Sequence, residues 1–215
     1  MPVFRPDEEP RLRELLDAME RPVELVVALG PEETPLPGTR DVDFSAETVR
    51  IVEALAALSG RVTSRIEQQP DGVTLFPAVL VLPAGEDLGL RYYGTPYGLE
   101  LASLVGAVLE AGRTVSSLAP ESLERLATLD RDLAIDVFVT PTCPHCPPAV
   151  LLAYRLALAS PHVAAAAIEA AEFPRLADEL NVQAVPRIVV NGVPQWDGAA
   201  REAVFVERIL APSFE

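Results

Sequence analysis

Two cysteines, three positions apart, are the residues of this sequence best suited to chemistry. They stand in the run Cys143-Pro144-His145-Cys146, and the 215-residue chain has no other cysteine. Two thiols at this spacing can exchange with disulfides: one thiolate attacks a disulfide sulfur, and the second thiol resolves the mixed disulfide. Closing so short a loop adds little stability, so a purely stabilising disulfide is a poor explanation for the pair.

The surroundings of Cys143 favour a reactive thiolate. An apolar strand is predicted over residues 134–139, and a helix is predicted to open at the cysteine pair. Unpaired N–H groups and the helix dipole would lower the pKa of Cys143, which we expect to be the nucleophile, with Cys146 as the resolving thiol. Pro144 suits the first helical position. His145 can donate to the thiolate or carry charge beside it, although it could equally be an ordinary exposed residue.

Two other interpretations of the cysteine pair stay open. A zinc site needs four ligands. Besides the two cysteines, the sequence offers only His145 and His162 as nitrogen ligands, and carboxylates would have to supply any others. The pair could also be inert and buried. Redox chemistry explains more of the pattern, because strand, proline, cysteine pair and helix coincide.

A second signal is Val185-Pro186, which stands immediately before a predicted hairpin strand. Proline is tolerated at a strand start, and the peptide bond before it is either an ordinary trans bond or a purposeful cis bond.

Composition bounds the classes of partner and compartment. The formal net charge is −15 and the pI about 4.5, so we expect no nucleic-acid partner and no membrane partner. All 17 basic residues are arginine, which fits a GC-rich coding sequence or a thermophile. The first ten residues lack the features of a signal peptide, and the apolar runs are too short to span a bilayer. We therefore expect a cytoplasmic protein with no bound cofactor.

The chain is predicted to consist of two similar α/β halves. Strands are expected over residues 22–29, 61–69, 78–82, 90–93, 134–139, 163–168, 187–190 and 193–196. Helices are expected over residues 46–58 (capped by Ser45), 99–110, 120–129, 143–159, 174–180 and 200–210. Phe76-Pro77 before the first hairpin parallels Val185-Pro186 before the second. This order predicts two β-α-β-α-β-β-α-like units of about 100 residues.

Several motifs resemble those of the protein disulfide oxidoreductases of thermophilic archaea and bacteria, which are glutaredoxin-like proteins with two fused thioredoxin folds. The similar runs are Val137 to Pro147, Glu172-Phe173-Pro174, Asn181 to Pro186, Gly198-Ala199 and the segment Gly94 to Glu100. The resemblance implies two tandem thioredoxin-like domains, residues 1–114 and 115–215, each a central mixed β-sheet flanked by helices. It also implies a cis Val185-Pro186 bond facing the cysteine pair. We accordingly expect Val185 and Pro186 to contact substrate, together with Thr142 and Pro144 beside the nucleophile. Finally, it implies exchange with protein thiols and disulfides, often fed by an NADPH-dependent thioredoxin reductase.

One departure separates the two halves. Members of the family usually have a C-x-x-C in each half, whereas the equivalent stretch here, Gly30 to Pro37, has no cysteine. All exchange is therefore expected to pass through Cys143 and Cys146. The main hypothesis is a thiol–disulfide oxidoreductase acting on proteins. The alternatives are a tandem-fold binding module with an incidental dithiol, and a dedicated electron donor to a peroxidase such as a peroxiredoxin.

Overall fold

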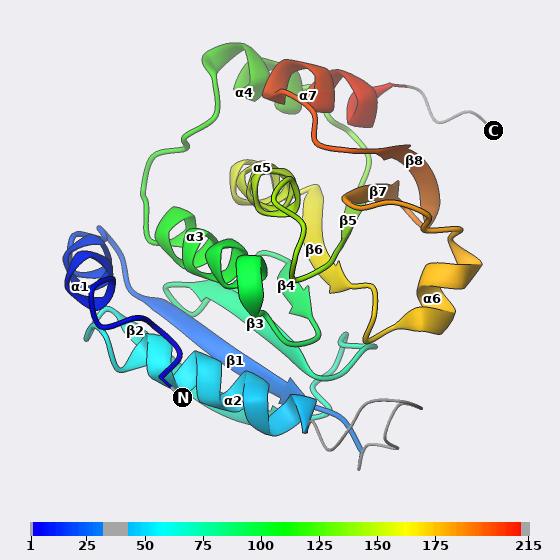
Figure 1. Cartoon of the computed structure of the whole chain (residues 1–215). Coiled ribbons are helices and arrows are strands. Elements are labelled where there is room, and N and C mark those ends of the chain that lie inside the picture. The colour runs from blue at the N-terminus through cyan, green and yellow to red at the C-terminus, as the bar shows by residue number, and fades with distance from the viewer. Residues whose placement is uncertain (1, 32–42, 212–215) are drawn as a thin grey trace.

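One eight-stranded sheet runs through the whole molecule, as the computed structural model of residues 2–31 and 43–211 shows (Figure 1). The strands are β1 (Val23–Leu29), β2 (Val62–Gln68), β3 (Ala78–Pro83), β4 (Leu90–Tyr93), β5 (Leu133–Val139), β6 (Val163–Glu169), β7 (Arg187–Val190) and β8 (Val193–Asp197). Their order across the sheet is β2-β1-β3-β4-β6-β5-β7-β8. All eight strands predicted from the sequence are present.

Each half pairs its four strands in the same way. Strand β1 is parallel to β2 and antiparallel to β3, and β3 is antiparallel to β4. Strands β5, β6, β7 and β8 repeat this pattern. The two predicted α/β units are therefore confirmed. The halves join because β4 pairs in parallel with β6, which places Leu90 opposite Ala165.

The helices of the described residues follow the same repeat, except that η1 occurs only in the first half and α6 only in the second. They are α1 (Glu9–Asp17), α2 (Phe44–Ala56), the 3-10 turn η1 (Gly98–Glu100), α3 (Leu101–Ala111), α4 (Pro120–Leu126), α5 (Cys146–Ala159), α6 (Pro174–Glu179) and α7 (Glu202–Leu210). The sequence did not predict α1. Helix α2 begins two residues earlier than expected, because the side chain of Asp43, and not Ser45, accepts a hydrogen bond from Ala46 N at 2.9 Å. In residues 2–31 and 43–211, no helix is long and apolar enough to cross a bilayer.

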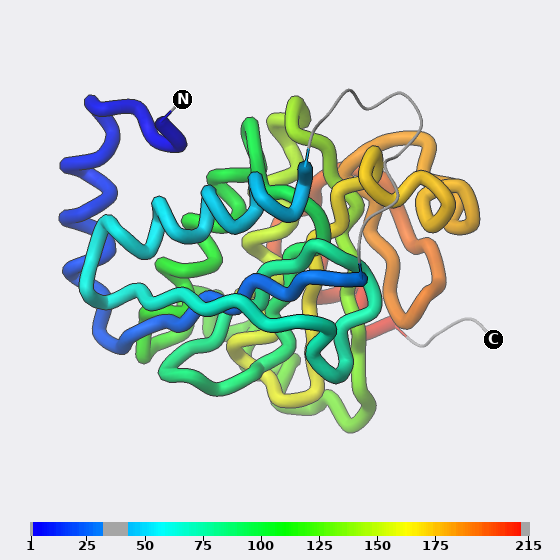
Figure 2. Tube along the Cα trace, turned by 90° about the horizontal axis from the view of Figure 1, so that it is seen from below, coloured from blue at the N-terminus to red at the C-terminus, as the bar shows by residue number. Residues whose placement is uncertain are grey.

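A single apolar core continues from one half into the other. It contains fully buried side chains from both, such as Leu25 and Leu55 in the first half and Val137 and Leu156 in the second. Helices α3 and α5 pack closely, since a Cβ on Gly106 would lie 2.4 Å from Leu151 Cδ2. Helix α1 and the β7–β8 hairpin lie at opposite ends of the molecule (Figures 1 and 2). The predicted boundary at residue 114 falls between α3 and α4 and stays a prediction, because sheet and core are shared.

Candidate active site

The two cysteines form a disulfide just beyond the end of β5. Cys143 and Cys146 are joined, with Cα atoms 5.5 Å apart. Their exposure differs: Cys143 keeps 8% of its surface, whereas Cys146 is fully buried. Cys143 is therefore the more accessible of the two cysteines, which is the asymmetry that a nucleophile and a resolving thiol need.

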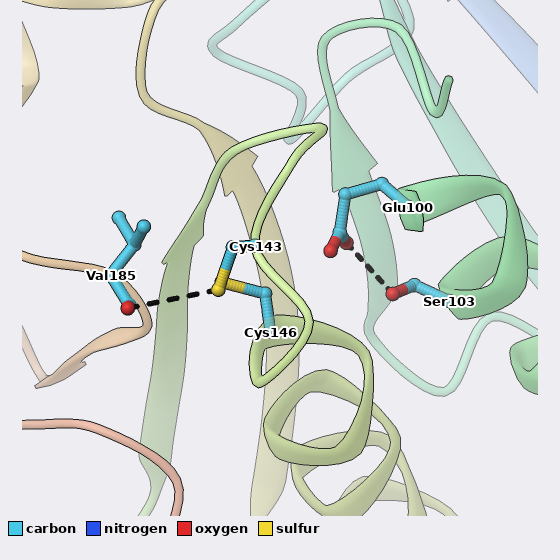
Figure 3. Close-up of a disulfide and its surroundings, with 5 residues drawn as sticks. All are labelled: Glu100, Ser103, Cys143, Cys146 and Val185. Carbon is cyan, nitrogen blue, oxygen red and sulfur yellow. Dashed lines mark hydrogen bonds between the residues drawn. A yellow bond between two sulfur atoms is a disulfide. The ribbon is translucent and has the colours of Figure 1, made fainter. Parts of the chain in front are cut away.

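The backbone of Val185 faces the disulfide from β7's side. Cys143 Sγ lies 3.7 Å from Val185 O (Figure 3). The Val185-Pro186 peptide is cis, as the resemblance to the disulfide oxidoreductases implies. Pro186 is buried and Val185 is half-buried. The fold thus brings Val185 and Pro186 together with Cys143, 42 positions earlier in the chain than Val185.

The helix after the cysteines begins later than the sequence predicted. Its first residue is Cys146, and the expected placement of Pro144 at the first helical position is wrong. The residues Cys143 to Cys146 form a turn instead, closed by a long 3.4 Å hydrogen bond from Cys146 N to Cys143 O. Pro147, not Pro144, occupies the early helical position where a missing N–H costs least. Thr142, Pro144 and His145 are exposed around the disulfide, where a substrate could contact them.

A buried carboxylate from the first half lies at this site, and the sequence assigned it no role. Glu100 ends η1, which packs against α5, and Figure 3 shows it on the side of the disulfide opposite Val185. Ser103 Oγ donates to Glu100 Oε2 at 2.7 Å, while Oε1 has no hydrogen-bond partner among the described residues. Burial raises the pKa of Glu100 to about 7, against the lowering effect of the Ser103 hydrogen bond. Such a group can take up and release a proton near neutral pH.

Second-half contacts hold the segment that carries Glu100. Glu172 Oε1 accepts a hydrogen bond from Thr95 N at 2.8 Å, and Leu99 N donates to Pro141 O at 2.8 Å. Gly98 adopts φ +61°, and a Cβ there would lie 2.6 Å from Pro141 O. Residues 95–100 are therefore held against the loop that carries the dithiol. Their contact there is Pro141, which stands two residues before Cys143.

In the first half, the position after β1 that corresponds to the dithiol loop has no cysteine. Gly30, directly after β1, packs against the ring of Phe76, and the Phe76-Pro77 peptide is cis like its counterpart. Positions 32–37 of the cysteine-free stretch lie outside the described residues. Within the described residues, no three His, Cys, Asp or Glu side chains come together as a metal site would require.

Known proteins with two thioredoxin folds match nearly the whole chain. The family model described as "Thioredoxin domain" matches residues 133–211. A protein disulfide oxidoreductase from Aeropyrum pernix K1 superposes with a TM-score of 0.82 and 27% identity, over 95% of this chain and 91% of that one. The chain thus has a tandem thioredoxin-like fold.

Two further similarities of this chain are to alkyl hydroperoxide reductases. It is 29% identical to alkyl hydroperoxide reductase AhpF of Escherichia coli K12 over 182 residues, which are 85% of this chain. It spans about a third of the length of that relative. The NTD_N/C domain of alkylhydroperoxide reductase AhpF from Enterococcus faecalis shares the fold, with a TM-score of 0.84, 24% identity, and coverage of 96% of this chain and 99% of that one.

Proposed function

We propose that the chain exchanges electrons between its Cys143–Cys146 pair and the disulfides or dithiols of partner proteins. The observation that carries the proposal is the unequal burial of the pair beside the Val185 carbonyl. Cys143 keeps some solvent-exposed surface, whereas Cys146 has none. The proposal extends to the cytoplasm as the working compartment, because exchange in the reducing direction needs a cellular reductant.

The exchange proceeds in two displacements. The Cys143 thiolate attacks one sulfur of a partner disulfide, a new S–S bond forms, and the other partner sulfur leaves as a thiolate that takes a proton. The Cys146 thiolate then attacks Cys143 Sγ and expels the second partner thiolate. The partner disulfide gains two electrons, and the Cys143–Cys146 dithiol is oxidised to the disulfide.

Val185 and Glu100 have separate tasks in this scheme. The backbone of Val185 holds an extended partner segment beside Cys143 Sγ by strand addition. The enclosed Cys146 must lose a proton before it can attack, and Glu100 is a buried carboxyl group on the side of the disulfide opposite Val185 (Figure 3). We assign Glu100 as the acceptor of that proton, which it later returns to the leaving thiolate.

Reduction of insulin disulfides by the chain, with dithiothreitol as reductant, tests the proposal. Turnover is expected for the unaltered protein and should disappear in Cys143→Ser. The Cys146→Ser variant should instead accumulate mixed disulfides with its partners, because resolution is blocked. Partner capture that is the same with and without either cysteine would support the binding-module alternative and contradict the proposal.

A second candidate function is supported by the similarity to alkyl hydroperoxide reductase AhpF. In this version the dithiol passes electrons to a peroxidase such as a peroxiredoxin, and an NADPH-dependent thioredoxin reductase restores it. A coupled assay would contain the chain, thioredoxin reductase, NADPH, a peroxiredoxin and peroxide. NADPH consumption that requires both Cys143 and the peroxiredoxin would support this role, and consumption independent of the chain would contradict it.

A further inference from the structure

Two large apolar side chains of the first half stand beside the dithiol loop. They are Tyr97 and Leu99. Their segment is held by two hydrogen bonds to the second half, from Thr95 N to Glu172 Oε1 and from Leu99 N to Pro141 O. Because both anchors are main-chain hydrogen bonds on the first-half side, the position of the segment does not depend on the side chains of Tyr97 and Leu99.

Both side chains are open to solvent. Tyr97 is 42% exposed and Leu99 is 44% exposed, in a segment whose next residue, Glu100, is fully buried. The other exposed large apolar side chains of the described chain lie on β2, the α3–α4 connection, β8 and α7: Ile66, Val115, Val193 and Val204. Isolated exposed apolar residues are common, whereas a pair next to a reactive group is typical of a contact surface.

The chemistry of the site determines what covers this pair. A mixed disulfide attaches the partner covalently to Cys143, a residue that is 8% exposed. Val185 lies on one side of that sulfur, and Glu100, the neighbour of Leu99, lies on the other (Figure 3). A polypeptide bonded to Cys143 advances about 3.3 Å per residue in extended form, so its next few residues reach beyond the loop on both sides.

We propose that Tyr97 and Leu99 form a docking surface for the protein segment that carries the exchanging cysteine, and that they contact apolar side chains flanking that cysteine. The inference rests on the proposed function and adds a substrate class, namely protein segments with apolar neighbours. A small polar disulfide reaches Cys143 without meeting this surface. The first half, which has no cysteine, thus contributes to substrate selection.

Paired kinetics on a protein and a small disulfide test the docking surface. The variant Tyr97→Ser/Leu99→Ser should reduce insulin with kcat/KM lowered about tenfold, mainly through KM, because the apolar contact area of two side chains is lost. Its kcat/KM for bis(2-hydroxyethyl) disulfide should stay within about twofold of the unaltered protein. The matched control is Val115→Ser/Val193→Ser, which also removes two exposed apolar side chains and should change neither substrate.

Three results would overturn the docking surface while leaving the proposed function intact. Insulin kinetics within about twofold of the unaltered protein would show that the pair is not contacted. An equal loss for both substrates would show damage to the dithiol itself. Loss of a dimer in sedimentation of Tyr97→Ser/Leu99→Ser would show that a second copy of the chain covers the pair. Failure of the proposed function differs from all three, because Cys143→Ser would then match the unaltered protein on both substrates.

Discussion

The two halves have the same strand pairing but differ where their equivalent central strands end. Beyond β5, a disulfide lies 3.7 Å from the carbonyl of Val185. Directly after β1, Gly30 lies against Phe76 so closely that a Cβ on Gly30 would be 2.8 Å from Phe76 Cβ. In the second half, Val185 before the cis proline therefore faces the sulfur of Cys143. In the first half, Phe76 before the cis proline packs its ring against the backbone of Gly30. The proline hairpin thus belongs to both folds, whereas the dithiol is a separable addition to one.

Removing the dithiol is the most direct test of the difference between the two halves. Cys143→Ser should lower insulin reduction by at least about 10³-fold, because the reachable thiolate is lost and Cys146 is enclosed. Residual turnover above that level would mean that a partner disulfide can react directly with Cys146. Alkylation with iodoacetamide after reduction in denaturant provides the control, with two modified cysteines in the unaltered protein and one in the variant.

The support that the first half gives to the site can be tested at Gly98. Gly98→Ala should lower the free energy of unfolding by about 3 kcal/mol, because a Cβ strains the positive φ and approaches Pro141 O. Insulin reduction should fall with it. Gly72→Ala is the matched control, since Gly72 has φ +77° but nothing within 4 Å of an added Cβ, and it should cost about 1 kcal/mol. Equal losses in chemical denaturation would show that the contact with Pro141 is unimportant.

Glu100 sharpens the comparison through pH. Its folded pKa of about 7 lies above the ordinary value of 4.5, so the folded protein binds the proton more tightly and stability falls as pH rises between those values. Glu100→Gln should therefore leave stability unchanged near pH 4 and raise it by up to about 3 kcal/mol at pH 8. Part of the decline should persist, because burial also raises the pKa of Asp136, to about 6.

The same variant should slow exchange. Without a proton acceptor for Cys146, insulin reduction by Glu100→Gln at pH 8 is expected to fall about tenfold, and the rise in rate near pH 7 should disappear. Glu207→Gln, which alters an exposed carboxylate on α7, is the control and should retain the profile. An unchanged pH profile in Glu100→Gln would exclude the carboxylate from proton transfer.

The smallest expected effect concerns the reduction potential. The Pro144-His145 dipeptide also occurs in strongly oxidising bacterial periplasmic enzymes, so a glutathione titration should give a potential above the roughly −270 mV of thioredoxin. His145→Ala should move it by about 30 mV or less, since His145 is exposed. A value at or below that of thioredoxin would contradict the expectation.

Local patterns were enough to predict much of the fold. Short apolar runs with β-branched residues indicated the strands, and the parallel between Phe76-Pro77 and Val185-Pro186 indicated the repeat. The pairing of β4 with β6 could not be predicted, because the two strands lie far apart in the chain and nothing in either one specifies its partner. Helix α1 was missed since its polar sequence buries only Leu16.

The candidate site was predictable only in part for the same reason. The cysteine pair is a local motif, and the resemblance to a known family added the proline that faces it. Glu100 precedes the dithiol loop by two helices and a strand, and a carboxylate at a helix start is ordinary, so its burial beside the dithiol appears only in three dimensions. The late start of α5 was missed because proline at position 144 suits a turn as well as a first helical residue.

The shared sheet also bears on the history of the chain. If the first half were deleted, β6 would lose β4 and present a bare strand edge, Gly106 would no longer meet Leu151, and Glu100 would leave the dithiol. The second half depends on the first for a neighbouring strand and a buried carboxylate, so the first half can be retained for its fold alone, although it has no cysteine.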